Sequence, residues 1–352
     1  MPRDGFASLP PFATTAIGSL PQPEPAAALA MLDAADLDLP CWPQLPQRSF
    51  LELMVPQAAR PMPFLVVDET ARRVRAAPPD VRPQRLAQAW EWILAGDHER
   101  FALSPVEAAA WPPFLAATAS RPAVKGQLTG PVTLGLGALD EQERPIFFHA
   151  DLRDAAVQAT AAAARAQAAA LGASRRLVLL SADEPTLGVL GTAGYLGVTR
   201  EDALGALAAT LSAIREAGAI AGVHCCGAAD WELVLEAGAD VLFADAFAYG
   251  SSLLAAARAL RPFLDRGGRI GWGLAPTDDA SAGASVDEML GRYRETEEAL
   301  VRAGLDRDML RARSLLTPAC GCGSLRPEQA ADVLAKLARL RARLRGMAGG
   351  RD

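Results

Sequence analysis

The sequence has few histidines and cysteines, 3 and 5 respectively among 352 residues. It also lacks an uncharged apolar run of about 18 residues, the length that a membrane-spanning helix needs. Its first residues, MPRDGFASLPPFATTAIGSLP, have no apolar core of about 7–15 residues, which a secretory signal would contain. We therefore expect a cytoplasmic protein with reduced cysteines, in which clustered cysteines indicate metal binding or catalysis before disulfides.

An excess of positive charge is absent as well. The chain has 35 basic and 41 acidic residues, a formal net charge of −6, and no dense basic run, so neither a nucleic acid nor an anionic membrane surface is expected as a partner. Only Lys125 and Lys336 are lysines, which leaves 33 of the 35 basic residues as arginine. With 51% hydrophobic residues, the composition is that of an ordinary globular protein with a sizeable core.

Eight short apolar runs rich in β-branched residues recur along the chain, and most are followed by an amphipathic helical stretch. We expect strands at residues 14–19, 37–42, 123–129, 177–182, 219–224, 240–245, 269–273 and 314–319. Strands that alternate with helices form a parallel sheet, and eight such units close into a (β/α)8 TIM barrel. The predicted fold class is therefore α/β, with residues 1–352 as a single TIM-barrel catalytic domain.

One connection is much longer than a crossover requires. Residues 43–122 separate the second and third expected strands, whereas a dozen or so residues suffice for a simple crossover. The segment contains tryptophan and proline-rich pieces, and we predict a helical insertion over the barrel mouth. Two roles stay open at this point: a lid that excludes water from an active site, or an accessory packing element.

The clearest candidate site is a metal centre. His224 and Cys226 lie two residues apart at the end of the fifth strand, which places both side chains on one face and Cys225 on the other. Cys320 follows the eighth strand, and in a barrel the carboxyl ends of all strands lie on the same face. One imidazole and two thiolates form a favourable donor set for zinc. The alternative is that these cysteines are inert core residues.

The fourth ligand is ambiguous. A structural zinc site is closed by four protein groups, whereas a catalytic site keeps one position for substrate. Asp245, at the end of the sixth strand, offers a displaceable oxygen, and Cys322, two residues beyond Cys320, competes with it. Cys41 stands alone near the second strand, so we expect it in the core.

An acidic pair ends the fourth strand. Asp183 and Glu184 precede Pro185, and we predict them as catalytic residues that bind a substrate ammonium group, with Asp183 first. The alternative is that they favour the positive end of a helix dipole. Lys125, on the third strand, could pair with either carboxylate, in a structural or a catalytic role.

The chain resembles a known family over nearly its whole length. The motifs that carry the resemblance are TTAIGSLP at 14–21, KGQLTGP at 125–131, DEP at 183–185 and the two cysteine segments. They are similar to motifs of the zinc-dependent methyltransferases, which include the catalytic C-terminal core of cobalamin-independent methionine synthase and the methylcobamide:thiol methyltransferases, in the uroporphyrinogen decarboxylase-like superfamily. By this resemblance His224, Cys226 and Cys320 match zinc ligands. Asp245 falls where the synthase carries a glutamate ligand.

The resemblance also implies a substrate site. Ile17, Gly18 and Ser19 match the segment that holds the backbone of homocysteine, and Asp183 matches the carboxylate that meets its amino group. Gln44 is a departure, because the synthase carries at this position a glutamate that also binds the amine. A neutral amide can hydrogen-bond to an ammonium group but cannot form an ion pair with it.

We therefore predict a zinc-dependent methyltransferase, similar to core-type methionine synthase. It would hold homocysteine or a related small thiol as a zinc thiolate that accepts a methyl group. The His-X-Cys-Gly form at 224–227 is closer to the methylcobamide enzymes, and the synthase's folate-holding N-terminal half is missing, so a methyl-corrinoid protein is the preferred donor. The alternatives are a uroporphyrinogen decarboxylase-like enzyme and a non-catalytic barrel that binds zinc or a corrinoid partner.

Overall fold

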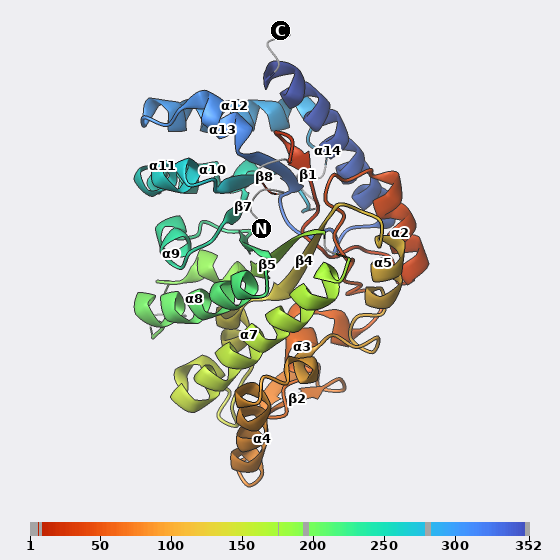
Figure 1. The fold of residues 1–352 in the computed structure, drawn as a ribbon, viewed down its shortest axis with the longest axis vertical. Helices are drawn as coiled ribbons and strands as arrows, with labels where there is room; N and C mark the ends of the chain where they lie inside the picture. The colour runs from red at the N-terminus through yellow and green to blue at the C-terminus, as the bar shows by residue number, and fades with distance from the viewer. Residues whose placement is uncertain (1–5, 7–8, 175, 193–196, 279–282, 349–352) are drawn as a thin grey trace.

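A seven-stranded, curled parallel sheet forms the centre of this α/β fold (Figure 1). The computed structural model describes residue 6 and residues 9–174, 176–192, 197–278 and 283–348. The strand order is β1-β9-β8-β7-β6-β5-β4, and all neighbours in it are parallel. The strands are β1 (Ala13–Thr14), β4 (Ala123–Thr129), β5 (Leu177–Asp183), β6 (Ile220–Cys225), β7 (Val241–Asp245), β8 (Arg269–Ala275) and β9 (Ser314–Pro318).

Helices pack around the outside of this sheet (Figure 1). The long ones are α7 (Ala150–Gly172), α8 (Arg200–Glu216), α12 (Val286–Arg302) and α14 (Pro327–Ala348). Shorter helices are α2 (Pro25–Ala34), α6 (Pro131–Gly137), α9 (Trp231–Glu236), α10 (Ala246–Ala255), α11 (Ala257–Asp265) and α13 (Arg307–Ala312), with 3-10 turns η3 (Ile146–Phe148) and η4 (Pro185–Val189). None of the helices in the described ranges combines the length and apolar character needed to cross a bilayer.

The strands are buried on both faces, as expected for a parallel sheet covered by helices. All seven residues of β4 and all seven of β8 are buried. Along β4 the polar residues Lys125, Gln127 and Thr129 alternate with small or apolar ones. Because side chains alternate between the faces of a strand, these three polar groups share one face of the sheet.

Six of the expected strands are confirmed to within two residues at each end, namely those at 123–129, 177–182, 219–224, 240–245, 269–273 and 314–319. The first expected strand, at 14–19, forms regular pairs only over Ala13–Thr14, against β9.

The prediction of a regular second strand at residues 37–42 is wrong. This part of the chain forms only single bridges, one to β4 at Cys41 and one at Gln44 to the chain just after β1. Pro40 and Pro43 have no N–H group, so they cannot donate to a continuous ladder.

Residues 39–44 nevertheless lie between the two edge strands. The Leu39 N–H donates to the Thr14 carbonyl oxygen on the β1 side (3.0 Å), and the Lys125 N–H donates to the Pro40 carbonyl oxygen on the β4 side (2.9 Å). The polar backbone groups at the two edges of the sheet are therefore partly satisfied by the same irregular segment.

The prediction that residues 43–122 form a helical insertion also needs correction. The segment contains η1 (Phe50–Glu52), α3 (Met54–Ala59), α4 (Arg82–Leu94), η2 (His98–Phe101) and α5 (Trp111–Ala117), but also an antiparallel hairpin of β2 (Leu65–Asp68) and β3 (Arg73–Ala76). The valines of both strands favour extended backbone, which the helical expectation overlooked. The hairpin and α4 lie together at one end of the molecule (Figure 1).

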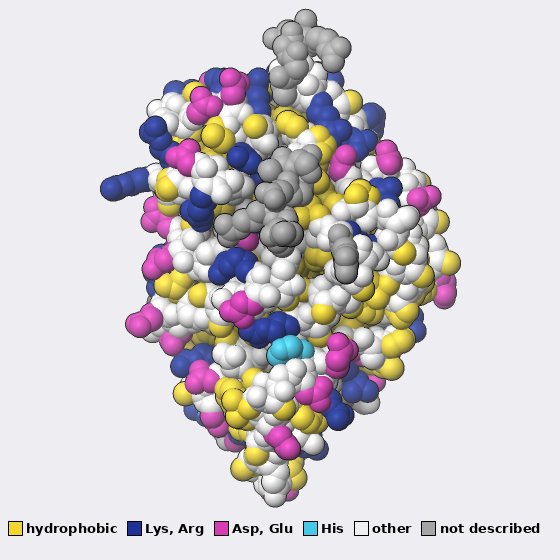
Figure 2. Space-filling view, in the orientation of Figure 1, with side chains coloured by type: hydrophobic (Ala, Val, Ile, Leu, Met, Phe, Trp, Pro, Cys, Tyr) yellow, Lys and Arg dark blue, Asp and Glu magenta, His cyan; other side chains and the backbone are white. Residues whose placement is uncertain are grey.

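Basic and acidic side chains are mixed on the surface. On the face shown in Figure 2, the described residues present both signs side by side, without a large field of one sign. This distribution agrees with the modest net charge of the sequence.

A buried carboxylate ties α12 to α13. Glu297 accepts two hydrogen bonds from Arg311 (2.8 and 3.0 Å), one from Arg307 (3.0 Å) and one from the Tyr293 hydroxyl (2.7 Å). Burial by itself raises the pKa of Glu297, but the hydrogen bonds from Arg311 and Tyr293 outweigh it, and the net pKa is lowered. The carboxylate is therefore held in its ionised form.

Replacing Glu297 with alanine should lower the free energy of unfolding by about 3 kcal/mol at neutral pH, because the variant removes the shared partner of Arg311 and Tyr293, while Arg307 keeps its pair with Glu298. Since the folded pKa is depressed, the difference should be full above the ordinary glutamate pKa of 4.5 and shrink as the pH falls through the folded value. Urea denaturation at several pH values measures it.

The matched control is Glu298→Ala, which removes a half-exposed carboxylate that pairs with Arg307. It should change the free energy of unfolding by less than about 1 kcal/mol. Equal effects of the two variants would contradict the assignment of Glu297 as the centre of the network.

Candidate metal centre and substrate cavity

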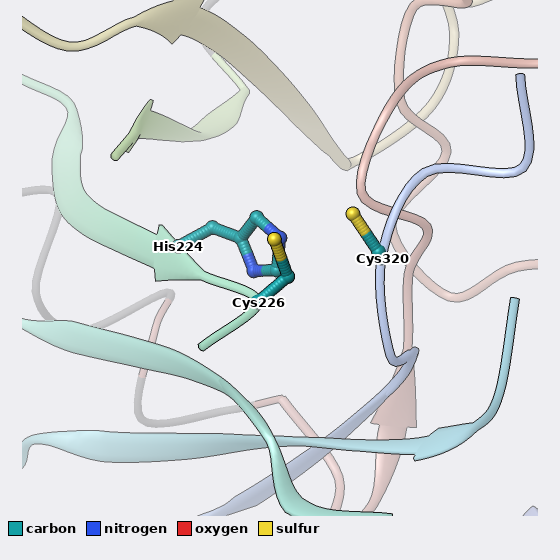
Figure 3. Close-up of side chains that lie close together, drawn as sticks. All are labelled: His224, Cys226 and Cys320. Atoms are coloured by element: carbon teal, nitrogen blue, oxygen red, sulfur yellow. The ribbon is translucent and has the colours of Figure 1, made fainter. Parts of the chain in front are cut away.

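One histidine and two cysteines meet at the carboxyl edge of the sheet. His224 is the fifth residue of β6, Cys226 follows that strand directly, and Cys320 lies two residues beyond β9. The three side chains turn toward one another from two strand ends (Figure 3). One donor atom from each lies within 4.8 Å of the other two, so the group could hold a metal ion.

The neighbouring strand sets the protonation of the imidazole. His224 Nδ1 lies 3.1 Å from the Phe243 carbonyl oxygen, which can only accept, so Nδ1 carries the hydrogen. His224 Nε2 then keeps a free lone pair, and this buried atom has no hydrogen-bond partner among the described residues. An unsatisfied buried polar atom is costly, and an imidazole fixed through its other nitrogen is the usual state of a metal ligand.

The two sulfurs are electronically unequal. The Cys320 thiol, acting as donor, lowers the pKa of Cys226, and the protonated form of His224 lowers it further, to about 4. The same hydrogen bond to Cys226, together with burial, raises the pKa of Cys320. The site thus favours the thiolate form of Cys226, which is the form that binds metals.

The remaining cysteines point elsewhere. Cys225 lies with its sulfur 3.9 Å from the Pro185 carbonyl oxygen, and burial raises its pKa to about 12. This confirms the alternation expected along β6. Cys322 is buried near Cys41, away from the group of three, and burial raises its pKa to about 12. As expected, Cys41 is a core residue.

Asp245 is not a member of the group either. Its Oδ1 accepts a hydrogen bond from the Ala248 N–H (2.9 Å) and caps α10. The role of Asp245 as fourth ligand stays a prediction. Within the described chain the geometry brings together three protein donors and leaves the fourth position to another group.

A cavity of about 460 Å³ opens over the three donors. Its wall comes from the chain after β1, from the insertion between residues 44 and 54, and from the ends of β5, β6 and β9. Of the predicted substrate-binding residues, Ile17, Ser19, Gln44 and Asp183 line it. Gly18 does not, but a Cβ at this position would lie 2.6 Å from the Gln127 side chain, so glycine permits a close approach to β4.

Asp183 offers a free carboxylate oxygen. Its Oδ1 accepts from the Ser181 hydroxyl (2.8 Å), whereas no described residue donates to Oδ2. Burial raises the pKa of Asp183, and the charges of Lys125 and His224 only partly offset this effect. The carboxylate can therefore receive a cationic or hydrogen-bond-donating group of a ligand.

Glu184 does not share this role. Its carboxylate accepts from the Val132 N–H (2.9 Å), the Thr133 N–H (2.7 Å) and the Thr133 hydroxyl (2.6 Å), and so caps the first turn of α6. Burial raises the pKa of Glu184 to about 7 against these hydrogen bonds. The structure thus separates the two acids: Asp183 lines the cavity, whereas Glu184 caps a helix, as the helix-dipole alternative described. A catalytic role for either residue stays a prediction.

A chain of amides orients Gln44. The Glu107 carbonyl oxygen accepts from Gln57 Nε2 (2.6 Å), and because a carbonyl can only accept, Gln57 must present Oε1 to Gln44 Nε2 (2.6 Å). Gln44 therefore keeps its Oε1 as a free acceptor. Sequence reasoning missed Gln57 and the apolar wall residues Leu53 and Met54, because no periodic pattern marks which side of a short helical turn faces a cavity.

Comparison with known proteins adds little. No family model matches the chain, and no curated protein matches it. One solved structure that resembles it is oxaloacetate acetylhydrolase in complex with the product oxalate, at 12% identity and a TM-score of 0.38, over 99% of this chain and 94% of that one. A likeness of this strength supports no argument about activity.

Removing one of the three metal-binding side chains should strongly weaken the affinity for metal. His224→Ala and Cys320→Ala should each weaken the affinity for zinc or cobalt by more than about 100-fold, since even the outer partners of metal ligands contribute 10–100-fold. Equilibrium dialysis with a chromogenic chelator measures the affinity. Cys322→Ala, which removes a buried thiol two residues away, is the control and should retain the metal. Loss of metal in Cys322→Ala would make Cys322 the fourth ligand.

Proposed function

We propose that this protein is a zinc-dependent methyltransferase of the methionine synthase type, which transfers a methyl group to homocysteine or a related small thiol. The observation that carries the proposal is the free Nε2 of buried His224, placed with two cysteine sulfurs at a cavity. Three protein ligands and one open position are typical of catalytic rather than structural zinc sites.

We further propose that the sheet closes into an eight-stranded TIM barrel, with residues 1–352 as one domain. The bridges and hydrogen bonds of segment 39–44 to β1 on one side and to β4 on the other support this closure. In such a barrel the active site lies at the carboxyl ends of the strands, which is where the metal-binding group and the cavity occur.

Bound zinc would hold a substrate thiol as its thiolate at neutral pH. The protein itself would fix the positions of the three metal-binding side chains. The Phe243 carbonyl orients the imidazole of His224, and Cys226 and Cys320, bound as thiolates, would offset the charge of a divalent ion. A substrate sulfur in this setting stays electron-rich, which favours attack on a methyl group over activation of water for hydrolysis.

The cavity wall suits a thiol that carries an ammonium group. Asp183 Oδ2 and Gln44 Oε1 are two acceptors without partners among the described residues. In the transfer, a bond forms between the substrate sulfur and the methyl carbon while the bond between donor and carbon breaks, and the electron pair stays on the donor. The proton of the thiol leaves to solvent when the substrate binds.

A methyl-corrinoid protein is the proposed donor. The His-X-Cys-Gly form of residues 224–227 supports this choice, because it is closer to the methylcobamide enzymes. A tetrapyrrole decarboxylase would need arginines for several substrate carboxylates, and no arginine appears in the part of the cavity wall that the structure describes. The metal-binding group therefore favours thiol methylation.

Zinc-edge X-ray absorption tests the function directly. Adding homocysteine to the zinc-loaded protein should add one sulfur at about 2.3 Å to the metal shell, and methylcobalamin should then yield methionine. Other small thiols in the same assay identify the acceptor. A zinc shell that no thiol changes would mean a structural site and would end the methyltransferase proposal.

Asp183→Asn should weaken binding of homocysteine about 10- to 150-fold, because a hydrogen bond to a charged group contributes about 1.5–3 kcal/mol. Binding of 2-mercaptoethanol, which has no ammonium group, should change little. Calorimetric titration of the zinc-loaded protein measures both thiols. Equal losses for the two ligands would contradict the role of Asp183 in ammonium recognition.

A further inference from the structure

Lys125 is a charged side chain with no exposed surface. Burying an ammonium group costs several kcal/mol unless its partners compensate. It is also one of only two lysines beside 33 arginines, and the other, Lys336, forms an ordinary pair with Asp332 on α14 (2.7 Å). A compact ammonium group at this buried position therefore calls for a specific explanation.

The contacts of Lys125 are with the wall of the cavity and the interior of the sheet. Its Nζ donates to the Ile17 carbonyl oxygen (2.7 Å), makes a longer contact with Gln127 Oε1 (3.5 Å), and lies 5.6 Å from the centre of the Phe243 ring. No carboxylate oxygen in the described ranges lies within 4.0 Å of Nζ. The direct pair with Asp183 or Glu184 that the sequence allowed is absent there.

Lys125 holds the segment of residues 17–19, which contacts both the cavity and the loop that follows Cys320. Ile17 and Ser19 line the cavity. Ser19 accepts hydrogen bonds from the loop after Cys320: its carbonyl oxygen from the Cys322 N–H (2.8 Å) and its hydroxyl from the Gly323 N–H (3.2 Å). The position of the Ile17 carbonyl is thus linked through two residues of backbone to the loop that carries a metal-binding sulfur.

The charge of Lys125 also matters to the cavity. Burial lowers the pKa of Lys125, and the charge of Asp183 is the largest of the effects that oppose this shift. An anionic sulfur that enters this region meets negative charge in a setting of low dielectric constant, where such repulsion is strong. The ammonium group of Lys125 reduces this repulsion.

We infer that Lys125 is a positioning residue for thiol binding, which holds residues 17–19 of the cavity wall through the Ile17 carbonyl oxygen and, as an ammonium group, reduces the repulsion that an anionic thiol meets. This inference rests on the proposed function for its substrate. It assigns to Lys125 no contact with the reacting atoms.

The test is Lys125→Met, which keeps an unbranched side chain, one atom shorter, and removes its charge and its hydrogen bond. Affinity for zinc should stay within about twofold, because Lys125 touches no ligand. The dissociation constant for homocysteine should rise at least about 10-fold, as expected for the loss of charge-assisted interactions. Hydrogen exchange of a peptide that covers residues 13–22 should become faster.

The matched control is Lys336→Met, the same substitution at the other lysine of the chain. It should leave thiol binding, zinc affinity and exchange of residues 13–22 unchanged. Unchanged thiol binding or unchanged exchange in Lys125→Met would overturn the inference. So would a Lys125→Met protein that fails to fold or loses zinc together with thiol, because the role would then be purely structural.

The wild-type protein separates this inference from the proposed function. If zinc-loaded wild-type protein binds no thiol, the proposed function fails, and the inference fails with it. If the wild type binds thiol and Lys125→Met binds it equally well, only the inference fails.

Discussion

The parallel register between β6 and β7 is the constraint on which the metal-binding group depends. It sets His224 opposite Phe243, whose carbonyl oxygen takes the Nδ1 hydrogen and leaves Nε2 as the free donor. Because side chains alternate along a strand, a slip of one residue would send the imidazole to the opposite face and separate it from both cysteines. The pairing of β6 with β7 thus supplies the hydrogen-bond partner that orients His224 for metal binding.

Buried charges are concentrated at this edge of the sheet. Asp183 and Lys125 are both buried, and the Cys226 thiolate lies close by. Each would be costly alone, but opposite charges and directed hydrogen bonds reduce the cost. Glu184 resembles them in burial, yet its oxygens are fully used by the first turn of α6. The difference between a residue that supports the fold and one that can meet a ligand is therefore a difference in unused hydrogen-bonding capacity.

Much of the fold and the centre of the site could be predicted from local pattern. Six strands follow from apolar runs, because a strand buried on both faces needs a nearly continuous apolar sequence. His224, Cys226 and Cys320 could be grouped in advance, since parallel strands bring their carboxyl ends to one edge whatever their separation in sequence. The opposite direction of Cys225 follows from alternation alone.

Other features depended on contacts between distant segments, and only the tertiary structure decided them. The chain near Pro40 and Pro43 bridges two edge strands without becoming a strand, because its geometry is imposed by both neighbours and its prolines lack donors. Gln44 presents an acceptor to the cavity because Gln57, thirteen residues away, fixes its amide. The sequence by itself determined which donor atoms gather at the sheet edge, since that needs only strand order and alternation. The directions of the surrounding polar side chains required the packed structure, because each is set by a partner that no local pattern reveals.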